Sequence, residues 1–425
     1  CKQNPPWRSI LMTSRCCFLL AVLACRCALC EDWPQFGGPG ATGISPEKGL
    51  PVSWSGKKNV AWKFRLPGSG WSSPVVVGDK VYLSAAVEGE KASKDNPALV
   101  ALSVDCKSGK LLWQTELFAR ARSSRRHSKN SHASPTPLVD DGRLYVHFGT
   151  NGTACLDLAG KILWKNEELV YSPVHGGGSS PVRAGEVIVF SCDGAADPFV
   201  VGLDRKTGKI RCKTKRPKSS GKLFAFATAL ALELEGKTQI ILPGANWIAS
   251  YDPADGKEIW RAWHGGYSVV PRPLYGHGLV YFSSSFDRAK LFAIRPDGKG
   301  EVTKTHIAWE SAKSAPHSPS PVLVGDELYC VSDRGIASCI EARTGKLHWR
   351  ERVGGNYSSS IFSADGKIYF QSEQGEGVVI EAGKEFKVLS RNKLGERTLA
   401  SYAISSGAIY IRGADHLFKI QASAD

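Results

Sequence analysis

The sequence predicts an all-β fold in which eight four-stranded antiparallel blades form a closed propeller. Residues 318–349 contain one whole blade, because short turns at 325–326, 333–335 and 344–346 separate four strand-like segments. A sheet of this size cannot bury both of its faces alone, so it needs neighbours of the same kind. A turn followed by an anchor residue, usually Trp, recurs along the chain. The anchors are Trp62, Trp113, Trp164, Cys212, Trp260, Trp309, Trp349 and Leu389.

The anchors are spaced about 40–50 residues apart, which is the period of a propeller blade. After the last anchor, the chain has room for three strands, at residues 399–404, 408–412 and 417–420. We expect residues 59–64 to supply the missing outer strand, because a ring closed in this way leaves no exposed sheet edge. A seven-bladed ring is the alternative, if the weak copy that ends at Cys212 or Leu389 merges with its neighbour.

Residues 1–30 have the pattern of a secretory signal peptide, and residues 31–425 are predicted to form a single propeller domain. The leader has a basic start, an apolar core at 18–24 and small residues at its end. The apolar core is shorter than the roughly 20 residues that a membrane span requires, so no span is expected. Because Met12 is the sole Met, residues 1–11 are placed upstream of the true start.

The leader predicts export to the periplasm or the cell envelope. Residues 22–25 weakly resemble a lipoprotein cleavage box, so lipid anchoring is kept as the less favoured alternative. Nothing in the pattern predicts an oligomer, and we expect a monomer.

Six cysteines lie outside the leader, and none of them are spaced as Cys-x-x-Cys. Zinc binding is therefore not expected, and no metal site is predicted. Cys330 and Cys339 lie on consecutive predicted strands, where a hairpin would set them opposite each other. In an oxidising compartment this pair is the candidate disulfide.

The net charge of the chain is +15, and part of the excess is concentrated in one loop. Arg120, Arg122, Arg125 and Arg126 are predicted to form a basic rim that favours acidic partners. The simpler alternative is a solvated mobile loop. No aromatic residues alternate with these charges, and export also argues against nucleic acid as a partner.

Binding residues are expected on the face of the ring that carries the longer loops, close to the axis. The loops that enter the inner strands contribute Trp71, His132, His175, Phe226, Tyr267, Arg272, His317 and Tyr357. The loops between the second and third strands contribute Asp193, Asp287, Arg288, Asp333 and Arg334. Together they predict a funnel for a protein partner or for a small, sugar-like or acidic ligand. A structural role in the loops is the alternative for each His.

The Thr-Gly-Lys turns with a following Trp, the Ser-x-Pro-Val strand starts and the segments 33–39 and 49–54 resemble the pyrroloquinoline-quinone-like propeller repeat family, over residues 32–421. That family includes quinoprotein dehydrogenases and the lipoprotein of the outer-membrane barrel-assembly machinery. The resemblance implies an exported, non-catalytic binding scaffold with PQQ-like repeats, active in cell-envelope protein assembly.

Two other functions stay open at this point. One is a quinone-dependent alcohol or sugar dehydrogenase that uses pyrroloquinoline quinone (PQQ) and calcium, and the other is a carbohydrate- or polyanion-binding module. Many of the dehydrogenases carry adjacent cysteines beside the cofactor, whereas the only adjacent pair here is Cys16 and Cys17 in the leader. No Asp can be matched to a catalytic base or a calcium ligand. We therefore expect no cofactor, and the sequence assigns no catalytic residue.

Overall fold

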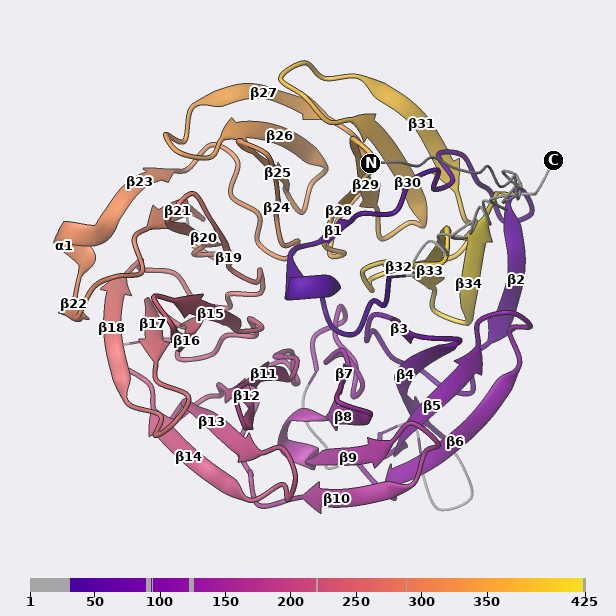
Figure 1. Cartoon of the computed structure of the whole chain (residues 1–425), viewed down its shortest axis with the longest axis horizontal. Helices are drawn as coiled ribbons and strands as arrows, with labels where there is room; N and C mark the ends of the chain where they lie inside the picture. Colours follow the sequence, from indigo (N-terminus) through magenta and orange to yellow (C-terminus); the bar gives the residue numbers. More distant parts are fainter. Residues whose placement is uncertain are drawn as a thin grey trace, which may run out of the picture. The chain divides into compact units, whose positions relative to one another are not determined.

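A computed structural model describes residues 31–88, 93, 95–121, 126–218, 221–287 and 289–422. The predicted leader lies outside the described residues. Within the unit Glu31–Asp425, eight sheets surround a central axis (Figure 1). The predicted eight-bladed propeller is confirmed, and the seven-bladed alternative is wrong, because Cys212 and Leu389 each lie on the outer strand of a separate blade.

Each blade runs from an inner strand at the axis to an outer strand at the rim. The first two blades are β3 (Val75–Val77), β4 (Lys80–Val87), β5 (Ala98–Asp105) and β6 (Leu111–Phe118), then β7 (Leu138–Asp140), β8 (Arg143–His147), β9 (Thr153–Asp157) and β10 (Ile162–Asn166). The next two are β11 (Val182–Ala184), β12 (Val187–Cys192), β13 (Phe199–Asp204) and β14 (Ile210–Lys215), then β15 (Leu230–Leu234), β16 (Lys237–Pro243), β17 (Trp247–Tyr251) and β18 (Glu258–Trp263).

The second half of the ring repeats this order. The fifth and sixth blades are β19 (Leu274–Gly276), β20 (Leu279–Ser283), β21 (Leu291–Ile294) and β23 (Ile307–Ser311), then β24 (Val322–Val324), β25 (Glu327–Val331), β26 (Ile336–Glu341) and β27 (Leu347–Arg352). The last two are β28 (Phe362–Ala364), β29 (Lys367–Gln371), β30 (Glu376–Glu381) and β31 (Val388–Lys393), then β32 (Ala403–Ser405), β33 (Ala408–Arg412), β34 (His416–Gln421) and β2 (Val60–Arg65). A short 3₁₀ helix, η2 (Gly149–Asn151), joins β8 to β9.

The first strand of the ring closes it, as predicted. β2 pairs antiparallel with β34, from Val60 opposite Ile420 to Arg65 opposite His416. Strands from the two ends of the domain thus share one sheet, and the last blade has no missing edge.

The outer strands interlock neighbouring blades through their tryptophans. The indole N–H of Trp309 donates a hydrogen bond to the Ala342 carbonyl in the turn of the next blade (2.9 Å). Gly345 in that turn has φ +75°, and a Cβ there would lie 2.8 Å from the Trp309 ring. The same contact joins Trp62 to Cys106, and Trp164 to Arg205. The repeated Gly and Trp are therefore two halves of one joint between blades.

The fourth blade departs from this pattern, because the chain between β21 and β23 is longer. This segment contains β22 (Gly300–Glu301), which pairs parallel with β18, and a one-turn helix, α1 (Thr303–His306). Trp260 donates to the side chain of Gln239 (3.0 Å), which in turn donates to the Pro296 carbonyl (3.2 Å). The link to the next blade is kept, with Gln239 as the intermediate.

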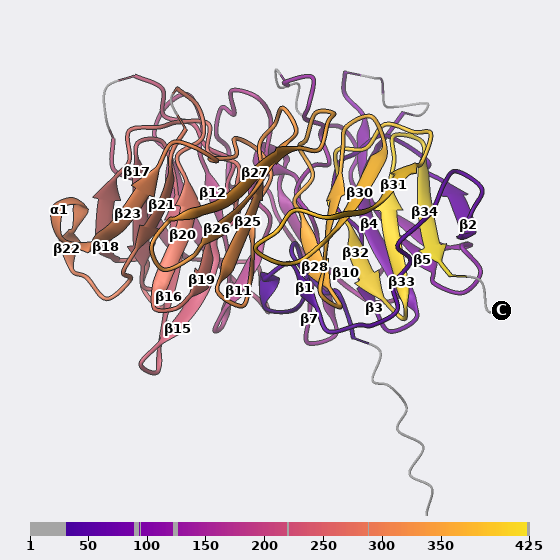
Figure 2. The same cartoon turned by 90° about the horizontal axis from the view of Figure 1, so that it is seen from above.

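The segment before β2 occupies the centre of the ring. A 3₁₀ helix, η1 (Pro39–Ala41), lies near the axis (Figure 1), and the following strand β1 (Ile44–Ser45) pairs parallel with β28. Trp33, which is buried, forms a bridge with Val76 of the first blade. Figure 2 shows η1 toward the side of the ring where the turn between β15 and β16 projects, which is the short-turn side.

Cys330 and Cys339 do not form the predicted disulfide. Cys330 pairs with Ser338 and Cys339 with Tyr329, so the two cysteines are offset by one residue. Neighbouring residues of a strand point to opposite faces of the sheet, and the two sulfurs therefore enter different cores. Both are free thiols.

Among the described residues, no helix is long and apolar enough to cross a membrane.

Candidate functional site: a funnel lined by the inner strands

A ring of hydroxyl groups surrounds the axis where the inner strands begin. Each hydroxyl oxygen accepts a hydrogen bond from a backbone N–H of the preceding blade, for example Thr136 from Ser73 (3.0 Å) and Ser73 from Ser401 (3.1 Å). The members of this hydroxyl ring are Ser73, Thr136, Ser180, Thr228, Ser320, Ser360 and Ser401. The fifth blade has Arg272 at this place, and its N–H donates to Ser320 (2.9 Å).

A cavity of about 610 Å³ lies against this ring. The residues two positions before the ring positions also line it, because alternate residues of an extended chain point the same way. They are Trp71, Ser134, Gly178, Phe226, Val270, Ser318, Ser358 and Leu399. The volume lies within the range of roughly 300–1,000 Å³ that is usual for small-molecule sites.

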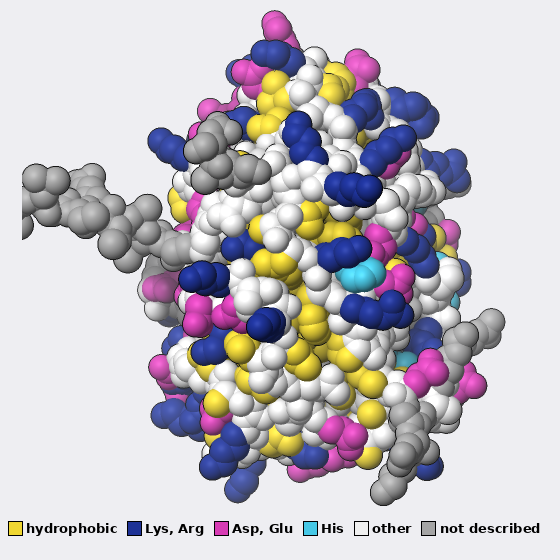
Figure 3. Space-filling model, turned by 90° about the vertical axis from the view of Figure 1, so that its right-hand side faces the viewer, with side chains coloured by type: hydrophobic (Ala, Val, Ile, Leu, Met, Phe, Trp, Pro, Cys, Tyr) yellow, Lys and Arg dark blue, Asp and Glu magenta, His cyan; other side chains and the backbone are white. Residues whose placement is uncertain are grey.

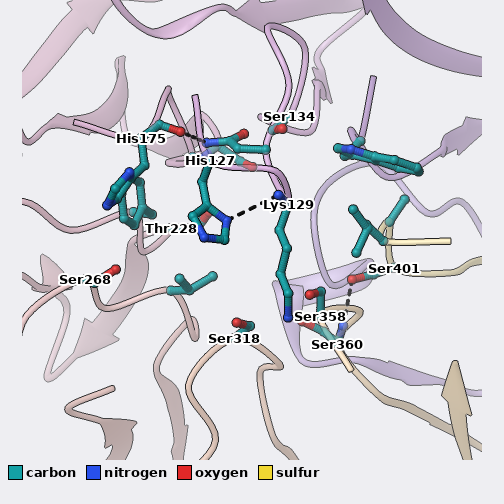
Figure 4. Close-up of a pocket in the computed structure, with 18 of the residues that line it drawn as sticks. His127, Lys129, Ser134, His175, Thr228, Ser268, Ser318, Ser358, Ser360 and Ser401 are labelled. Carbon is teal, nitrogen blue, oxygen red and sulfur yellow. Dashed lines mark hydrogen bonds between the residues drawn. The ribbon is translucent and has the colours of Figure 1, made fainter. Parts of the chain in front are cut away.

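One wall of the cavity is a continuous series of rings, which we call the aromatic arc: His127, His175, Phe224, Phe226, Tyr267 and Phe286. Neighbouring ring centroids are 5.5 Å apart for His127 and His175, 5.2 Å for His175 and Phe224, and 5.5 Å for Phe224 and Tyr267. Tyr267 and Phe286 are 6.1 Å apart. The opposite wall is formed mostly by serines, including Ser318, Ser358 and Ser360 (Figure 4).

Two lysines bring positive charge to the cavity. The Lys129 side chain extends across it toward Ser358 and Ser360 (Figure 4), and its Nζ lies 2.7 Å from a carboxylate oxygen of Glu373. The Lys222 Nζ lies 4.1 Å from the centre of the Tyr267 ring and donates a hydrogen bond to its hydroxyl (2.5 Å). That hydrogen bond raises the pKa of Lys222, so its ammonium keeps its charge at neutral pH.

The N-terminal segment closes the cavity on the short-turn side of the ring. Phe36 is among the lining residues. Behind it, the Arg272 guanidinium donates to the carbonyls of Ala41 in η1 (2.5 Å) and Ala229 (3.0 Å). Only 3% of Arg272 is exposed, and burial lowers its pKa to about 10. The site is therefore a funnel with a floor, not an open channel.

The structure brings several of the predicted binding residues together in this funnel: Trp71, His175, Phe226, Tyr267 and Asp333. The Asp333 carboxylate accepts hydrogen bonds from the backbone N–H of His317 (2.8 Å) and from both the N–H and the hydroxyl of Ser318. It holds the loop in place and has little capacity left for a ligand.

Three aromatic or histidine residues predicted from the inner-strand loops do not line the cavity in the described structure. Tyr357 is 1% exposed and packs near Phe370 between two blades. His317 lies against Phe286, and the next residue, Ser318, lines the funnel instead. A shift of one residue in an extended chain turns a side chain from the axis into the blade. His132 is buried against Arg126. Burial, with the neighbouring Arg126, lowers its pKa to about 4.

Apart from Asp333, the predicted charged residues of the loops between the second and third strands do not line the cavity in the described structure. Asp193 forms a buried ion pair with Arg216 (2.8 Å), and burial raises the pKa of Asp193 to about 6 in spite of that partner. Asp287 and Arg334 are exposed and do not line the cavity. Arg288 lies outside the described residues. Arg272 is at the axis as predicted, but beneath the floor.

The predicted basic rim is described only in part. Arg122 and Arg125 lie outside the described residues, Arg120 is exposed away from the cavity lining, and Arg126 contacts His132. Figure 3 shows Lys and Arg side chains spread over the outer surface on the β2 and β6 side of the ring, mixed with acidic and apolar side chains.

Sequence reasoning missed the hydroxyl ring. The signal for it was present, because a Ser or Thr directly precedes Pro at Ser73, Thr136, Ser180 and Ser320. It was interpreted as a strand start alone.

The lining residues do not fit a calcium-bound quinone. Calcium takes six to eight oxygen ligands, many of them carboxylates. Among the described residues, no three or more His, Cys, Asp and Glu side chains are grouped as a metal site would require. Asp333 is already occupied by the hydrogen bonds above.

Residues 60–223 and 244–415 match the family model described as outer membrane protein assembly factor BamB. The chain belongs to this family. The outer membrane protein assembly factor BamB of Nitrosomonas eutropha is 24% identical over 327 residues, which are 72% of this chain and 70% of that protein.

A second curated relative of this BamB-family propeller bears a different name. The tetrathionate hydrolase of Acidithiobacillus ferrooxidans is 23% identical over 323 residues, which are 70% of this chain and 58% of that protein. The crystal structure of BamB from Moraxella catarrhalis superposes with a TM-score of 0.59 at 15% identity, covering 86% of this chain and 98% of that one. This structural likeness supports the fold, and the family match confirms the resemblance seen in the sequence.

Proposed function

We propose that this BamB-family propeller is an exported, non-catalytic scaffold for protein assembly in the cell envelope, and that the long-loop face around the funnel receives its protein partner. The family membership and the relative from Nitrosomonas eutropha support the assembly role. The observation that carries the choice of face is the aromatic arc, whose outermost ring, Phe286, is 43% exposed beside the cavity. Aromatic anchors at the mouth of a concave site are typical of binding surfaces.

The funnel is also rigid, as a docking site should be. The hydroxyl ring ties the inner strands of neighbouring blades together, and the Trp joints tie their outer strands. A surface held in this way loses little conformational entropy on binding.

Site-specific photo-crosslinking in the native host tests the proposal. A benzoylphenylalanine at position 286 should crosslink to a component of the outer-membrane assembly apparatus. The matched control is the same group at Leu111, which is also 43% exposed but lies on the outer strand β6. Equal crosslinks at both positions, or none at position 286, would contradict the choice of face.

A second arm measures the role in cells. The double variant Tyr267→Ala with Phe286→Ala should lower the level of folded outer-membrane proteins while leaving the melting temperature nearly unchanged. The double variant Leu111→Ala with Leu112→Ala removes similar exposed apolar area at the rim and should have no such effect. An unchanged level of outer-membrane proteins in the first variant would argue against an assembly role.

A further inference from the structure

The hydroxyl ring leaves a set of hydrogen-bond donors facing the cavity. Each oxygen accepts a backbone N–H from the preceding blade, so a lone pair is engaged while the O–H proton remains available. In the described structure, these hydroxyls donate no hydrogen bond to a protein acceptor. Those that line the cavity are Ser73, Thr136, Ser180, Thr228, Ser360 and Ser401. Ser73, Thr136, Ser180 and Thr228 are each at least nine-tenths buried.

The described charged side chains near this ring that have no acidic partner are positive, so they favour an anion as the donors do. Arg272 is buried beneath the floor, and no described carboxylate lies within ion-pair distance of it. A buried cation normally has an acidic partner, because desolvation without one is costly. Lys222 adds a second positive charge at the wall. The nearby acids are already engaged, Asp333 by Ser318 and Glu373 by Lys129.

These donors select between two kinds of ligand. A sugar hydroxyl could pair with the ring hydroxyls, which each keep one lone pair, but it carries no charge and gains little from the positive charges nearby. An oxyanion only accepts, and it also benefits from the positive charges of Lys222 and Arg272. The aromatic arc beside the ring offers apolar surface for the rest of such a ligand.

We propose that the funnel binds a small amphiphilic carboxylate, with its carboxylate at the hydroxyl ring and its apolar body against the aromatic arc. This binding is a further activity of the chain. It requires no protein partner, so it does not depend on the assembly role, and its failure would leave that role untouched.

Binding of 4-phenylbutyrate to the purified chain tests the proposal by isothermal titration calorimetry. We expect one site per chain, with affinity that falls as salt is added. The neutral 4-phenylbutanamide should bind about tenfold or more weakly, because it lacks the charge that strengthens the hydrogen bonds. Butyrate should also bind more weakly, because it lacks the ring. Equal affinity for the acid and the amide, or no binding of the acid at millimolar concentration, would overturn the proposal.

Two variants locate the site. Lys222→Gln should weaken 4-phenylbutyrate binding about tenfold. The control Lys218→Gln removes the same charge from an exposed lysine that pairs with Asp197 and does not line the cavity, and it should have no effect. Equal weakening by both variants would mean that general surface charge, and not the funnel, holds the ligand.

Thr228→Val keeps the shape of the side chain and removes one ring donor. It should weaken the acid by several-fold and leave the weak binding of the amide nearly unchanged. Thermal unfolding of each variant, measured beside the titration, shows whether the ring is intact. An intact Thr228→Val variant that binds the acid as tightly as the parent would place the carboxylate elsewhere and overturn the proposal.

Discussion

Strand β18 carries two tryptophans for which the same substitution should lower stability by different amounts. Trp260 has 0% exposure, and packs with Phe282 and Phe292 of the next blade. Trp263, three residues later on the other face, is 40% exposed. Trp260→Ala should lower the free energy of unfolding by about 3–5 kcal/mol, the usual loss for a large aromatic deleted from a core. Trp263→Ala should lower it by about 1–2 kcal/mol, because much of that side chain is already in water.

The lost hydrogen bond adds little to the first value. Gln239 Oε1, which accepts from Trp260, also accepts from the Ser250 hydroxyl (2.5 Å), so it is not left without a partner. Equilibrium urea unfolding followed by circular dichroism measures both variants against the parent. The slope of the unfolding free energy against urea concentration should be the same in all three proteins, so that their stabilities can be compared. Equal losses for the two variants would refute the assignment of Trp260 as a joint between blades.

Further predictions concern closure, the turns, pH and the cysteines. Deletion of residues 31–64 removes β2 and the segment at the axis, so cooperative thermal unfolding of the ring should be lost or strongly lowered; unchanged melting would disprove closure by β2. Gly345→Ala should cost about 1–3 kcal/mol from positive φ and from contact with Trp309, whereas Gly366→Ala, at φ +68° with nothing within 4 Å, should cost about 1 kcal/mol; equal losses in urea unfolding would exclude the contact. Burial lowers the pKa of His147 to about 3 and of His264 to about 4. As the pH falls, these histidines are therefore protonated in the unfolded chain before they are protonated in the folded chain. The stability that the two buried neutral histidines contribute is complete above about pH 6.5 and is lost as the pH falls toward 4. His264→Asn should make that decline shallower by up to about 1.4 kcal/mol per pH unit, and an identical pH profile would show that His264 is not buried neutral. Mild oxidation should leave Cys330 and Cys339 as thiols by mass spectrometry, and a native disulfide between them would overturn the observed register.

The repeats alone were enough to predict the architecture. The spacing of the eight anchors, most of which follow a glycine turn by a few residues, predicted the number of blades. The count of strands after Leu389 predicted closure by β2, which the pairing with β34 confirms. These features are local and repeated, so each copy supports the same conclusion.

The funnel could be predicted only in outline, because its chemistry depends on the orientation of single residues. Trp71, His175 and Tyr267 were placed correctly, whereas His317 and Tyr357 were each one residue from the position that faces the axis. In irregular loops the sequence does not show where the two-residue alternation begins, and a one-residue error reverses the side chain.

Only the tertiary structure decided what meets at the axis. Serines and threonines from separate blades form one ring, and Arg272 reaches Ala41, 231 residues earlier in the chain. The sequence by itself determined the repeat and the blade, since both rest on contacts between near neighbours. It also determined the closing strand, because the strand count left one place empty in the last blade, although that strand pairs across the two ends of the domain. The floor of the funnel and its ring of hydroxyl groups arise from contacts between distant residues, and only the closed ring brings those residues together.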